Sequence, residues 1–544
     1  MARPHLCLPG SDSGQSWALS PGGRPGRAHL VGIGGAGMRS LAEVLLGWGW
    51  RISGSDLSVE SVQFPTQAGV RLYQGHAATH LAPKTDLVIH SDAVPAENPE
   101  LVRAGELDIP VQSYFQTLGK LMLDRRGIAV AGTHGKSTTT AMLGSVLIEA
   151  GHDPTVVFGA APLGQHSGGR PGRGPALVVE ACEYRANFLH LSPLQAVILG
   201  IEPDHFDCYH SPGQLHEAFA RFARRISDGG LLLTRYDCRV SRKTAAQAGC
   251  RTATFGFQAA ADWSALDLDS HPAGVAAGAN AGSSDRPGAE ASVAFRSAKE
   301  RGFRGAKGDN PTDIDSPVFS PGGHAGWDPS SRRGRYAFDL VHQGRKLARV
   351  RLKVPGKHNV ANALAAAALA WENGVGPEAI VRGLESFAGL RRRLEWLGCW
   401  RGVTLLDDYA HHPTEISATL RAVRQMYPGR RVWCVFQPHQ ASRTAHLLDE
   451  LAASLENADR VFVAEIFRAR EPSPRPGEVT AADLAQRIRL PESEVPDAHD
   501  TELIFRLLET RLAPGDVLIT MGAGDIGKLS NALFERLRQD RAAG

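Results

Sequence analysis

The segment AGTHGKSTTT, from Ala131 to Thr140, constrains the fold of this chain more than any other segment. It follows an apolar run and leads into a helical pattern, which predicts a strand, a glycine-bounded loop and a helix in succession. Backbone N–H groups at such a helix start bind phosphate. The loop has the short form G-x-x-G-K-S, and a chance Gly-Lys-Ser turn is the alternative. We predict a phosphate-binding loop for ATP made of Gly132, Thr133, His134, Gly135, Lys136, Ser137 and Thr138.

A second glycine turn lies near the amino terminus, in HLVGIGGAGM. Gly32, Gly34 and Gly37 have the G-x-G-x-x-G spacing after an apolar run, and the acidic Asp56 follows about twenty residues later. This pattern is typical of NAD-dependent dehydrogenases. A glycine turn at a helix start binds pyrophosphate whichever molecule carries it. The second phosphate loop, which follows it in the chain, argues against hydride chemistry and leaves open which phosphate compound this turn binds.

Alternating strand and helix patterns predict three consecutive α/β domains with parallel sheets, as expected for a chain of 544 residues. The predicted domains are 28–122, 123–388 and 389–544, after a disordered tail at 1–27. Within the second domain, residues 258–335 are rich in Gly, Ser, Asp and Pro and are predicted to be a low-complexity insertion. A hairpin is expected around Gln343 and Gly344.

Composition excludes several classes of function. The formal charge of +3 and the absence of aromatic residues among Lys/Arg runs imply no nucleic-acid partner and no membrane partner. No apolar stretch approaches the roughly 20 residues needed to cross a bilayer. The seven cysteines are scattered without a C-x-x-C pair, which indicates reduced thiols in a cytoplasmic protein.

Acidic side chains follow two predicted strands after the phosphate loop. Glu180 and Glu183 end the run VVEACEY, and IEPDHFD brings Asp204, His205 and Asp207 to the next strand end. Parallel strands place their carboxyl ends at one edge of the sheet, and Mg²⁺ prefers oxygen ligands. Each carboxylate alone would be read as a solvated loop charge, but together they predict a metal site.

The chain resembles the Mur ligase family, the ATP-dependent amino-acid ligases of peptidoglycan synthesis. The resemblance rests on HLVGIGGAGM, AGTHGKSTTT, GKHNVANALAA, LRRRLE, DDYAHHPTEI, FQPHQASRT and ITMGAGDI, in this order. It implies a Rossmann-like UDP-binding domain, a central ATP-binding domain and a C-terminal Rossmann-like ligase domain. The motif forms are most similar to the branch that joins L-alanine to UDP-N-acetylmuramate through an acyl phosphate, with ADP and phosphate released.

The resemblance also implies roles for individual residues. The UDP-sugar is expected at Gly34, Gly35, Ala36, Gly37, Asp56, His76 and Ser91. ATP is expected to contact Asn359, Arg392 and Asp407 in addition to the phosphate loop, with His358 and Asn362 beside Asn359. L-Alanine and the muramyl carboxylate are expected to meet at Tyr409, His411, His412, His439 and Arg443.

Two Mg²⁺ ions are implied by the same resemblance, one at Ser137 and Glu180 and a second at His205. The residues expected to carry catalysis are Lys136, Glu180, His205, His411 and Arg443. The third domain is expected to close on the others to exclude water, and the chain to be a monomer or weak dimer.

Two departures and three alternatives remain. Cys182 stands where the family has a carboxylate, and the insertion at 258–335 is unusual. A ligase that attaches a whole tripeptide to the same UDP-sugar is the nearest rival. A folylpolyglutamate synthase-like enzyme would lack the first domain, and a catalytically dead ATP-binding scaffold would have lost Lys136, Glu180 or His205.

Overall fold

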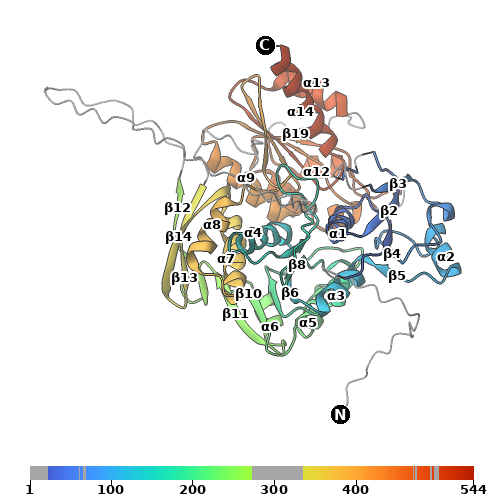
Figure 1. Cartoon of the computed structure of the whole chain (residues 1–544). Coiled ribbons are helices and arrows are strands. Elements are labelled where there is room, and N and C mark those ends of the chain that lie inside the picture. The colour runs from blue at the N-terminus through green and yellow to red at the C-terminus, as the bar shows by residue number, and fades with distance from the viewer. Residues whose placement is uncertain are drawn as a thin grey trace, which may run out of the picture.

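Three sheets follow one another along the chain (Figure 1), as the strand and helix patterns predict. The structure is a computed structural model and describes residues 23–543 except 61, 65–68, 272–334, 470, 472–473, 491–492 and 495–500. Most of the predicted tail at 1–27 and of the predicted insertion lies outside the described residues.

The first sheet has five parallel strands in the order β3-β2-β1-β4-β5. Its strands are β1 (Arg27–Val31), β2 (Arg51–Asp56), β3 (Arg71–Gln74), β4 (Leu87–His90) and β5 (Val111–Ser113). Its helices are α1 (Ala36–Gly47), η2 (Ala78–His80), α2 (Pro99–Glu106) and α3 (Tyr114–Leu123). The glycine turn lies between β1 and α1, with Gly35 as the N-cap residue of the helix.

The central sheet has nine strands in the order β14-β13-β12-β11-β10-β9-β6-β8-β7. The strands that pair in parallel are β6 (Arg126–Ala131), β7 (Thr155–Val157), β8 (Ala176–Glu180), β9 (Gln195–Ile198), β10 (Leu231–Arg235), β11 (Arg251–Gly256) and β12 (Trp263–His271). Antiparallel strands β13 (Arg335–His342) and β14 (Arg345–Pro355) complete it. Its helices are α4 (Lys136–Glu149), η3 (Tyr184–His190), α5 (Pro212–Ala223), α6 (Arg239–Ala245), α7 (Lys357–Glu372) and α8 (Pro377–Ser386).

One boundary in this domain corrects the sequence analysis. The segment from Gln258 was expected to lack regular structure, but β12 begins at Trp263, whose side chain is buried. Apolar and polar residues alternate in β12, as expected of a half-exposed strand, but this short pattern runs directly into the segment rich in Gly, Ser, Asp and Pro and was not separated from it. The predicted hairpin is confirmed, since β13 and β14 pair across a turn in which Gln343 and Gly344 both have positive φ, 48° and 76°.

The third sheet has the order β15-β16-β20-β17-β18-β19, with only β15 antiparallel among the described strands. Its strands are β15 (Glu395–Trp400), β16 (Val403–Asp408), β17 (Val432–Phe436), β18 (Arg460–Val463), β19 (Ser493–Glu494) and β20 (Val517–Met521). Its helices are α9 (Pro413–Met426), α10 (Ala441–His446), α11 (Leu448–Leu455), α12 (Ala481–Arg487), α13 (Thr501–Arg511) and α14 (Gly527–Ala543). Buried apolar clusters cover both faces of this sheet.

The first and central domains share one apolar core. A single buried cluster contains Leu41 and Leu45 of α1 together with Val157 and Val179 of the central sheet. Polar contacts reinforce this seam: Ser40 Oγ donates to Phe158 O at 2.7 Å, and Trp48 Nε1 donates to Gly172 O at 3.2 Å. A Cβ atom at Gly169 would collide with the backbone carbonyl of Ser40, so the two domains approach as closely as a glycine permits.

In the part of the chain that the structure describes, no helix is both long enough and apolar enough to span a bilayer. The third domain, orange to red in Figure 1, faces the central domain through α9, which packs against α7 and contacts the segments that follow β6 and β9. The carboxyl ends of the central strands therefore open toward the third domain.

Candidate nucleotide-binding and ligase site

The phosphate loop begins where β6 ends and passes into α4. Gly132 and Gly135 have φ of 125° and 81°, and Gly135 is the N-cap residue of the helix. A Cβ atom at Gly135 would collide with Asn362 Oδ1 of α7. Both its backbone conformation and its close neighbour therefore require glycine, and the predicted strand, loop and helix are confirmed.

Lys136 is held by the loop itself and by one carboxylate. Its Nζ donates to Gly132 O at 2.6 Å and to Thr133 O at 3.1 Å, and lies 2.9 Å from Glu183 Oε2. Burial would lower the pKa of Lys136, but the neighbouring Glu183 carboxylate outweighs it and raises the pKa. Lys136 is therefore a fixed cation whose donors must exchange partners to reach a phosphate.

Ser137 and Glu180 meet beside the loop. Ser137 Oγ donates to the Glu180 carboxylate at 2.9 and 3.0 Å, and Gly159 N donates to Glu180 Oε2 at 2.8 Å. A hydroxyl and a carboxylate at a strand end are oxygen ligands of the kind that Mg²⁺ binds. The donor set therefore fits the predicted metal site.

His205 lies against Glu183. Its Nε2 is 3.5 Å from Glu183 Oε1, its ring packs on Tyr184, and its φ of 56° holds it in a left-handed turn. Asp207, the other predicted candidate, accepts from Tyr184 Oη at 3.0 Å. Burial raises the pKa of Cys182 to about 12, so this departure from the family motif is a neutral thiol.

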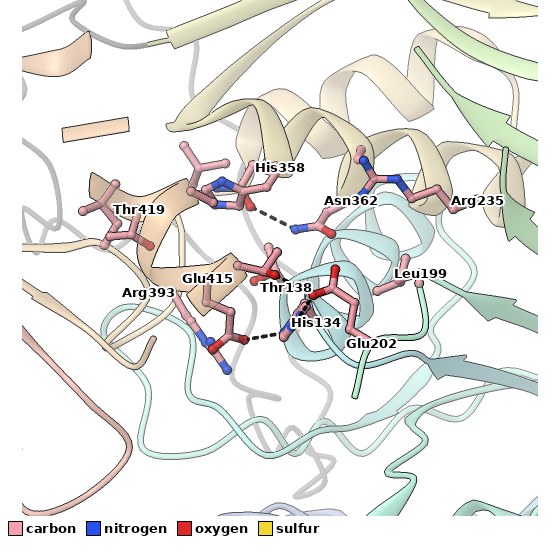
Figure 2. A pocket seen from close by; sticks show the side chains of 18 of the residues that line it. His134, Thr138, Leu199, Glu202, Arg235, His358, Asn362, Arg393, Glu415 and Thr419 are labelled. Carbon is pink, nitrogen blue, oxygen red and sulfur yellow. Dashed lines mark hydrogen bonds and ion pairs between the residues drawn. The ribbon is translucent and has the colours of Figure 1, made fainter. Parts of the chain in front are cut away.

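A cavity of about 530 Å³ extends from the phosphate loop to α7 and the third domain (Figure 2). Asn359 and Asn362 line it, and Asn359 Nδ2 donates to Pro355 O while Asn362 Nδ2 donates to Asn359 Oδ1. His358 also lines it, and burial lowers the pKa of His358 to about 4. The cavity joins the loop predicted to bind phosphate to the residues predicted to contact adenine.

Arg392 and Asp407 do not line this cavity, whereas their neighbours Arg393 and Asp408 do. Arg392 Nε donates to Asp407 Oδ2 at 3.0 Å and its Nη2 to Gly522 O at 2.8 Å. The structure thus brings the two predicted ATP contacts together as a pair at the carboxyl end of β16. Arg393 faces the cavity (Figure 2).

His134 connects the phosphate loop to the third domain (Figure 2). Its Nδ1 lies 3.1 Å from Glu415 Oε1 on α9, and its Nε2 lies 3.5 Å from Glu202 Oε2. Thr414 Oγ1 donates to Glu202 at 2.5 Å, and His412 Nε2 lies 3.2 Å from Pro203 O. We call His134, Glu202, His412 and Glu415 the interdomain cluster.

The residues predicted for L-alanine and the muramyl carboxylate lie together on the third domain. Tyr409 packs edge-on against His411, and the rings of His411 and His439 are 5.7 Å apart. Arg443 Nη1 lies 3.1 Å from His439 Nδ1. Burial, reinforced by the Arg443 charge, lowers the pKa of His411 to about 3, so this imidazole is neutral.

Arg443 has a partner in the central domain. Its Nε and Nη2 donate to Asp204 Oδ1 at 2.8 and 2.5 Å, and both side chains are less than a tenth exposed. The Arg443 charge, acting against burial, lowers the pKa of Asp204 well below its usual range. Asp204, a predicted metal candidate, is thus the counter-ion of Arg443, and a substrate carboxylate would have to share or replace it.

The predicted UDP-sugar residues gather at the carboxyl end of the first sheet. Gly34 N donates to Asp56 Oδ2 at 2.8 Å, and Ser91 packs on Gly32, where a Cβ atom would lie 2.9 Å from it. Ala36 is the first residue of α1, next to Gly35. His76 Nδ1 lies 3.0 Å from Ser55 Oγ, one residue before Asp56.

Sequence reasoning missed Glu202, Arg393 and Glu415, which line the cavity. Glu202 and Glu415 stand inside motifs that the sequence already singled out, IEPDHFD and DDYAHHPTEI. Glu202 precedes His205 in one motif and Glu415 follows His412 in the other, and this proximity to predicted site histidines was the available signal. Their common partner, His134, lies 281 residues before Glu415, and no spacing rule connects the two.

Three α/β domains with a phosphate loop at the central sheet define a nucleotide-dependent enzyme. Family models match along the chain: "Mur ligase family, catalytic domain" at residues 27–126, "Mur ligase middle domain" at 130–284 and "Mur ligase, glutamate ligase domain" at 392–524. The chain belongs to the Mur ligase family.

Similar proteins match this chain along nearly the whole length of both sequences. The UDP-N-acetylmuramate–L-alanine ligase of Clostridium novyi is 35% identical over 94% of this chain and 97% of its own. That of Salinibacter ruber is 37% identical over 95% of this chain and 96% of its own. The solved UDP-N-acetylmuramate-alanine ligase of Thermotoga maritima, 24% identical, has a TM-score of 0.69 and covers 94% of this chain and 99% of its own, which shows the same fold.

Proposed function

We propose that this protein joins L-alanine to the carboxylate of UDP-N-acetylmuramate at the expense of ATP, the first stem-peptide step of peptidoglycan synthesis. The observation that carries the proposal is the meeting of two sets of residues across one interface. The phosphate loop with Glu180 and Glu183 lies on the central domain, and His411, His439 and Arg443 face it from the third domain. The names of the full-length relatives support the amino acid and the sugar.

The first chemical step phosphorylates the muramyl carboxylate, because a free carboxylate is a poor electrophile. Phosphoryl transfer asks the protein chiefly for positioning and charge neutralisation. Lys136 supplies a fixed positive charge for the γ-phosphate and exchanges a loop carbonyl for a phosphate oxygen. Gly135 N and the following amides of α4 bind the remaining oxygens.

Mg²⁺ would be held by Ser137 and Glu180, with a second ion at His205, and would neutralise the phosphate oxygens. Glu183 keeps Lys136 and His205 in place from a side chain that is 1% exposed.

The second step is attack of the neutral alanine amine on the acyl carbon, which forms the C–N bond and breaks the C–O bond to phosphate, and the amine proton leaves with the departing phosphate. His411 Nδ1 lies 3.0 Å from Tyr409 O, so Nδ1 carries the hydrogen and the neutral ring keeps its lone pair at Nε2. That lone pair accepts a hydrogen bond from the amine and orients it. Arg443 binds the alanine carboxylate by releasing part of its contact with Asp204. Closure of the third domain on the central domain excludes water from the acyl phosphate.

The test is phosphate release with Mg²⁺-ATP and UDP-N-acetylmuramate while each amino acid is added separately. Turnover that requires both the UDP-sugar and L-alanine is the expected result. Turnover only with a tripeptide would assign the chain to the recycling ligases, and ATP binding without turnover in any mixture would favour a scaffold. We further propose that the protein acts in the cytoplasm, because all six described cysteines are free thiols, and that it is a monomer or weak dimer.

A further inference from the structure

A fully buried carboxylate lies beneath the proposed UDP-sugar site. Glu100, in the first turn of α2, has a side chain that is 0% exposed. Its Oε2 accepts from Ser55 Oγ at 2.5 Å and from His29 Nε2 at 3.4 Å, and its Oε1 accepts from His80 Nδ1 at 2.8 Å and Ala77 N at 3.2 Å. Burial would raise the pKa of Glu100, but hydrogen bonds from His29, Ser55 and His80 lower it to about 2. Glu100 is therefore ionised and accepts only.

This arrangement determines where the proton of His76 lies. Ser55 has one hydroxyl hydrogen and gives it to Glu100, so Ser55 Oγ can only accept from His76 Nδ1, 3.0 Å away. The same Nδ1 lies 3.6 Å from Glu100 Oε2, a second acceptor. Nδ1 must therefore carry a hydrogen, and a neutral His76 has its lone pair at Nε2.

His76 stands at the edge of the sheet where the nucleotide is expected. Ser55 and Asp56 end β2, and Asp56 Oδ2 accepts from Gly34 N of the glycine turn. The loop that carries His76 is tied to the same point, because Gly75 N donates to Asp56 O at 2.7 Å. The His76 side chain is 18% exposed, whereas Glu100 beneath it is inaccessible.

We propose that Glu100 is a positioning residue which, through Ser55, fixes His76 Nε2 as a hydrogen-bond acceptor for the imide N–H of a uracil base. This inference rests on the proposed binding of a UDP-sugar. Uracil carries a hydrogen at N3 where cytosine carries a lone pair, so an acceptor fixed at Nε2 favours uridine nucleotides over cytidine nucleotides. The buried negative charge of Glu100 thus determines which base the site prefers.

Glu100→Gln should reverse the direction of the hydrogen bonds from residue 100 through Ser55 to His76, with a minimal change of side-chain shape. The amide oxygen must stay opposite the Ala77 N–H donor, so the amide NH₂ takes the place of Oε2. Ser55 then accepts from the amide and gives its own hydrogen to His76 Nδ1, which moves the His76 hydrogen to Nε2. Glu106→Gln is the matched control, because Glu106 ends the same helix at the surface and pairs only with Arg103 among the contacts described.

The experiment measures two quantities on the full chain. Imidazole ¹⁵N chemical shifts, assigned with His76→Asn, report the tautomer, and calorimetry reports the affinities for UDP, CDP and 2′-deoxy-UDP. We expect the Nδ1–H tautomer and a preference for UDP in the wild type and in Glu106→Gln. In Glu100→Gln we expect the Nε2–H tautomer and roughly tenfold weaker UDP binding, with CDP binding unchanged or stronger. Ser55→Ala should also weaken UDP binding, by breaking the same link.

The contrary outcomes are distinct. An Nε2–H tautomer in the wild type, or unchanged UDP affinity in a folded Glu100→Gln protein, would overturn the inference while UDP binding itself stood. A loss that disappears with 2′-deoxy-UDP would assign the donor to the ribose and overturn the base assignment. If the wild type bound neither UDP nor the UDP-sugar, the proposed function would fail, and the ligand assigned to His76 with it.

Discussion

Lys136 makes its contacts with its own loop and with Glu183, so its position is set by the protein before it meets a phosphate. Positioned charge of this kind needs little rearrangement when negative charge develops on a transferred phosphoryl group. Glu183 is nearly inaccessible and also contacts His205, which makes it the residue that joins the cation to the second predicted metal ligand.

Replacing Lys136 should therefore lower kcat strongly while leaving the affinity for the UDP-sugar unchanged. We expect Lys136→Met to lower kcat for phosphate release by about a hundredfold to a thousandfold, the cost of removing one preorganised donor. The affinity for the UDP-sugar, measured by calorimetry, should stay unchanged because its predicted site lies on another sheet. Lys243→Met, an exposed lysine on α6, is the control. Near wild-type kcat in Lys136→Met would contradict the assigned role.

Glu180 should set the magnesium requirement. Chelation with EDTA should stop phosphate release and added Mg²⁺ should restore it. Glu180→Gln removes one charged oxygen ligand beside Ser137, so half-maximal activity should need roughly tenfold more Mg²⁺, about 1.4 kcal/mol of binding energy. Glu149→Gln, a partly exposed carboxylate paired with Arg382, should leave the Mg²⁺ titration unchanged. An identical titration for both variants would remove Glu180 from the metal site.

At the scale of elements, buried strands such as β6, β8 and β17 could be predicted because their apolar runs are nearly uninterrupted. The short β3 (Arg71–Gln74) is polar and partly exposed, so it gives no apolar signal. β12 alternates apolar and polar residues, but this short pattern continues directly into the segment predicted to be an insertion and was not separated from it. The phosphate loop was predictable because glycine, lysine and helix start are adjacent in sequence. Whether Arg392 or Arg393 faces the cavity was not, since it depends on a left-handed turn at Arg392 (φ 55°).

The loop after β9 and helix α10 meet through Asp204 and Arg443. Asp204→Ala leaves a buried guanidinium without its counter-ion, which typically costs about 3–5 kcal/mol. We expect a loss of that size in the free energy of unfolding, measured with urea. Asp449→Ala, which breaks the exposed pair with Arg487, should cost less than about 1 kcal/mol. Equal effects of the two changes would show that the Asp204–Arg443 pair does not hold these elements together.

The strands that flank residues 272–334 are already paired with each other. His271 of β12 lies opposite Arg335 of β13, so a short turn could join them. Replacing 272–334 with a Gly-Ser turn should leave the melting temperature unchanged and kcat/KM within about twofold of wild type, because the entropy of loop closure depends only weakly on loop length. A stable protein with lost activity would instead give this segment a catalytic role.

At the scale of the whole molecule, we expect the interdomain cluster to make the contact between the central and third domains depend on pH. Burial would lower the pKa of His134, but Glu415 and Glu202 outweigh it and raise the pKa to about 9, above its ordinary 6.5. A raised pKa means that the proton is bound more tightly in the folded protein. Its stabilisation is thus complete below pH 6.5 and is lost as the pH rises through 9.

We expect the apparent melting temperature to fall between pH 6.5 and pH 9.5, as a contribution of up to about 3 kcal/mol from His134 is lost. His134→Asn should flatten this dependence, because it removes the titrating ring between Glu202 and Glu415. His412, which faces His134, has a lowered pKa and titrates below this range. His210→Asn, which replaces an exposed histidine, is the control and should keep the wild-type pH dependence. If His134→Asn also kept the wild-type pH dependence of the melting temperature, the assignment to His134 would be wrong.

The close packing between the first and central domains also fixes a distance between the two domains. Helix α1 begins at the predicted UDP-sugar turn, and its flank rests on the glycines that follow the central sheet's β7. The separation between the two proposed nucleotide sites therefore depends on how closely the backbone at Gly169 lies on the backbone at Ser40. Even an alanine side chain at Gly169 would collide with the Ser40 carbonyl and push the first domain away from the central domain. We expect both proposed nucleotide substrates still to bind, while the muramyl carboxylate and the γ-phosphate lie too far apart to react.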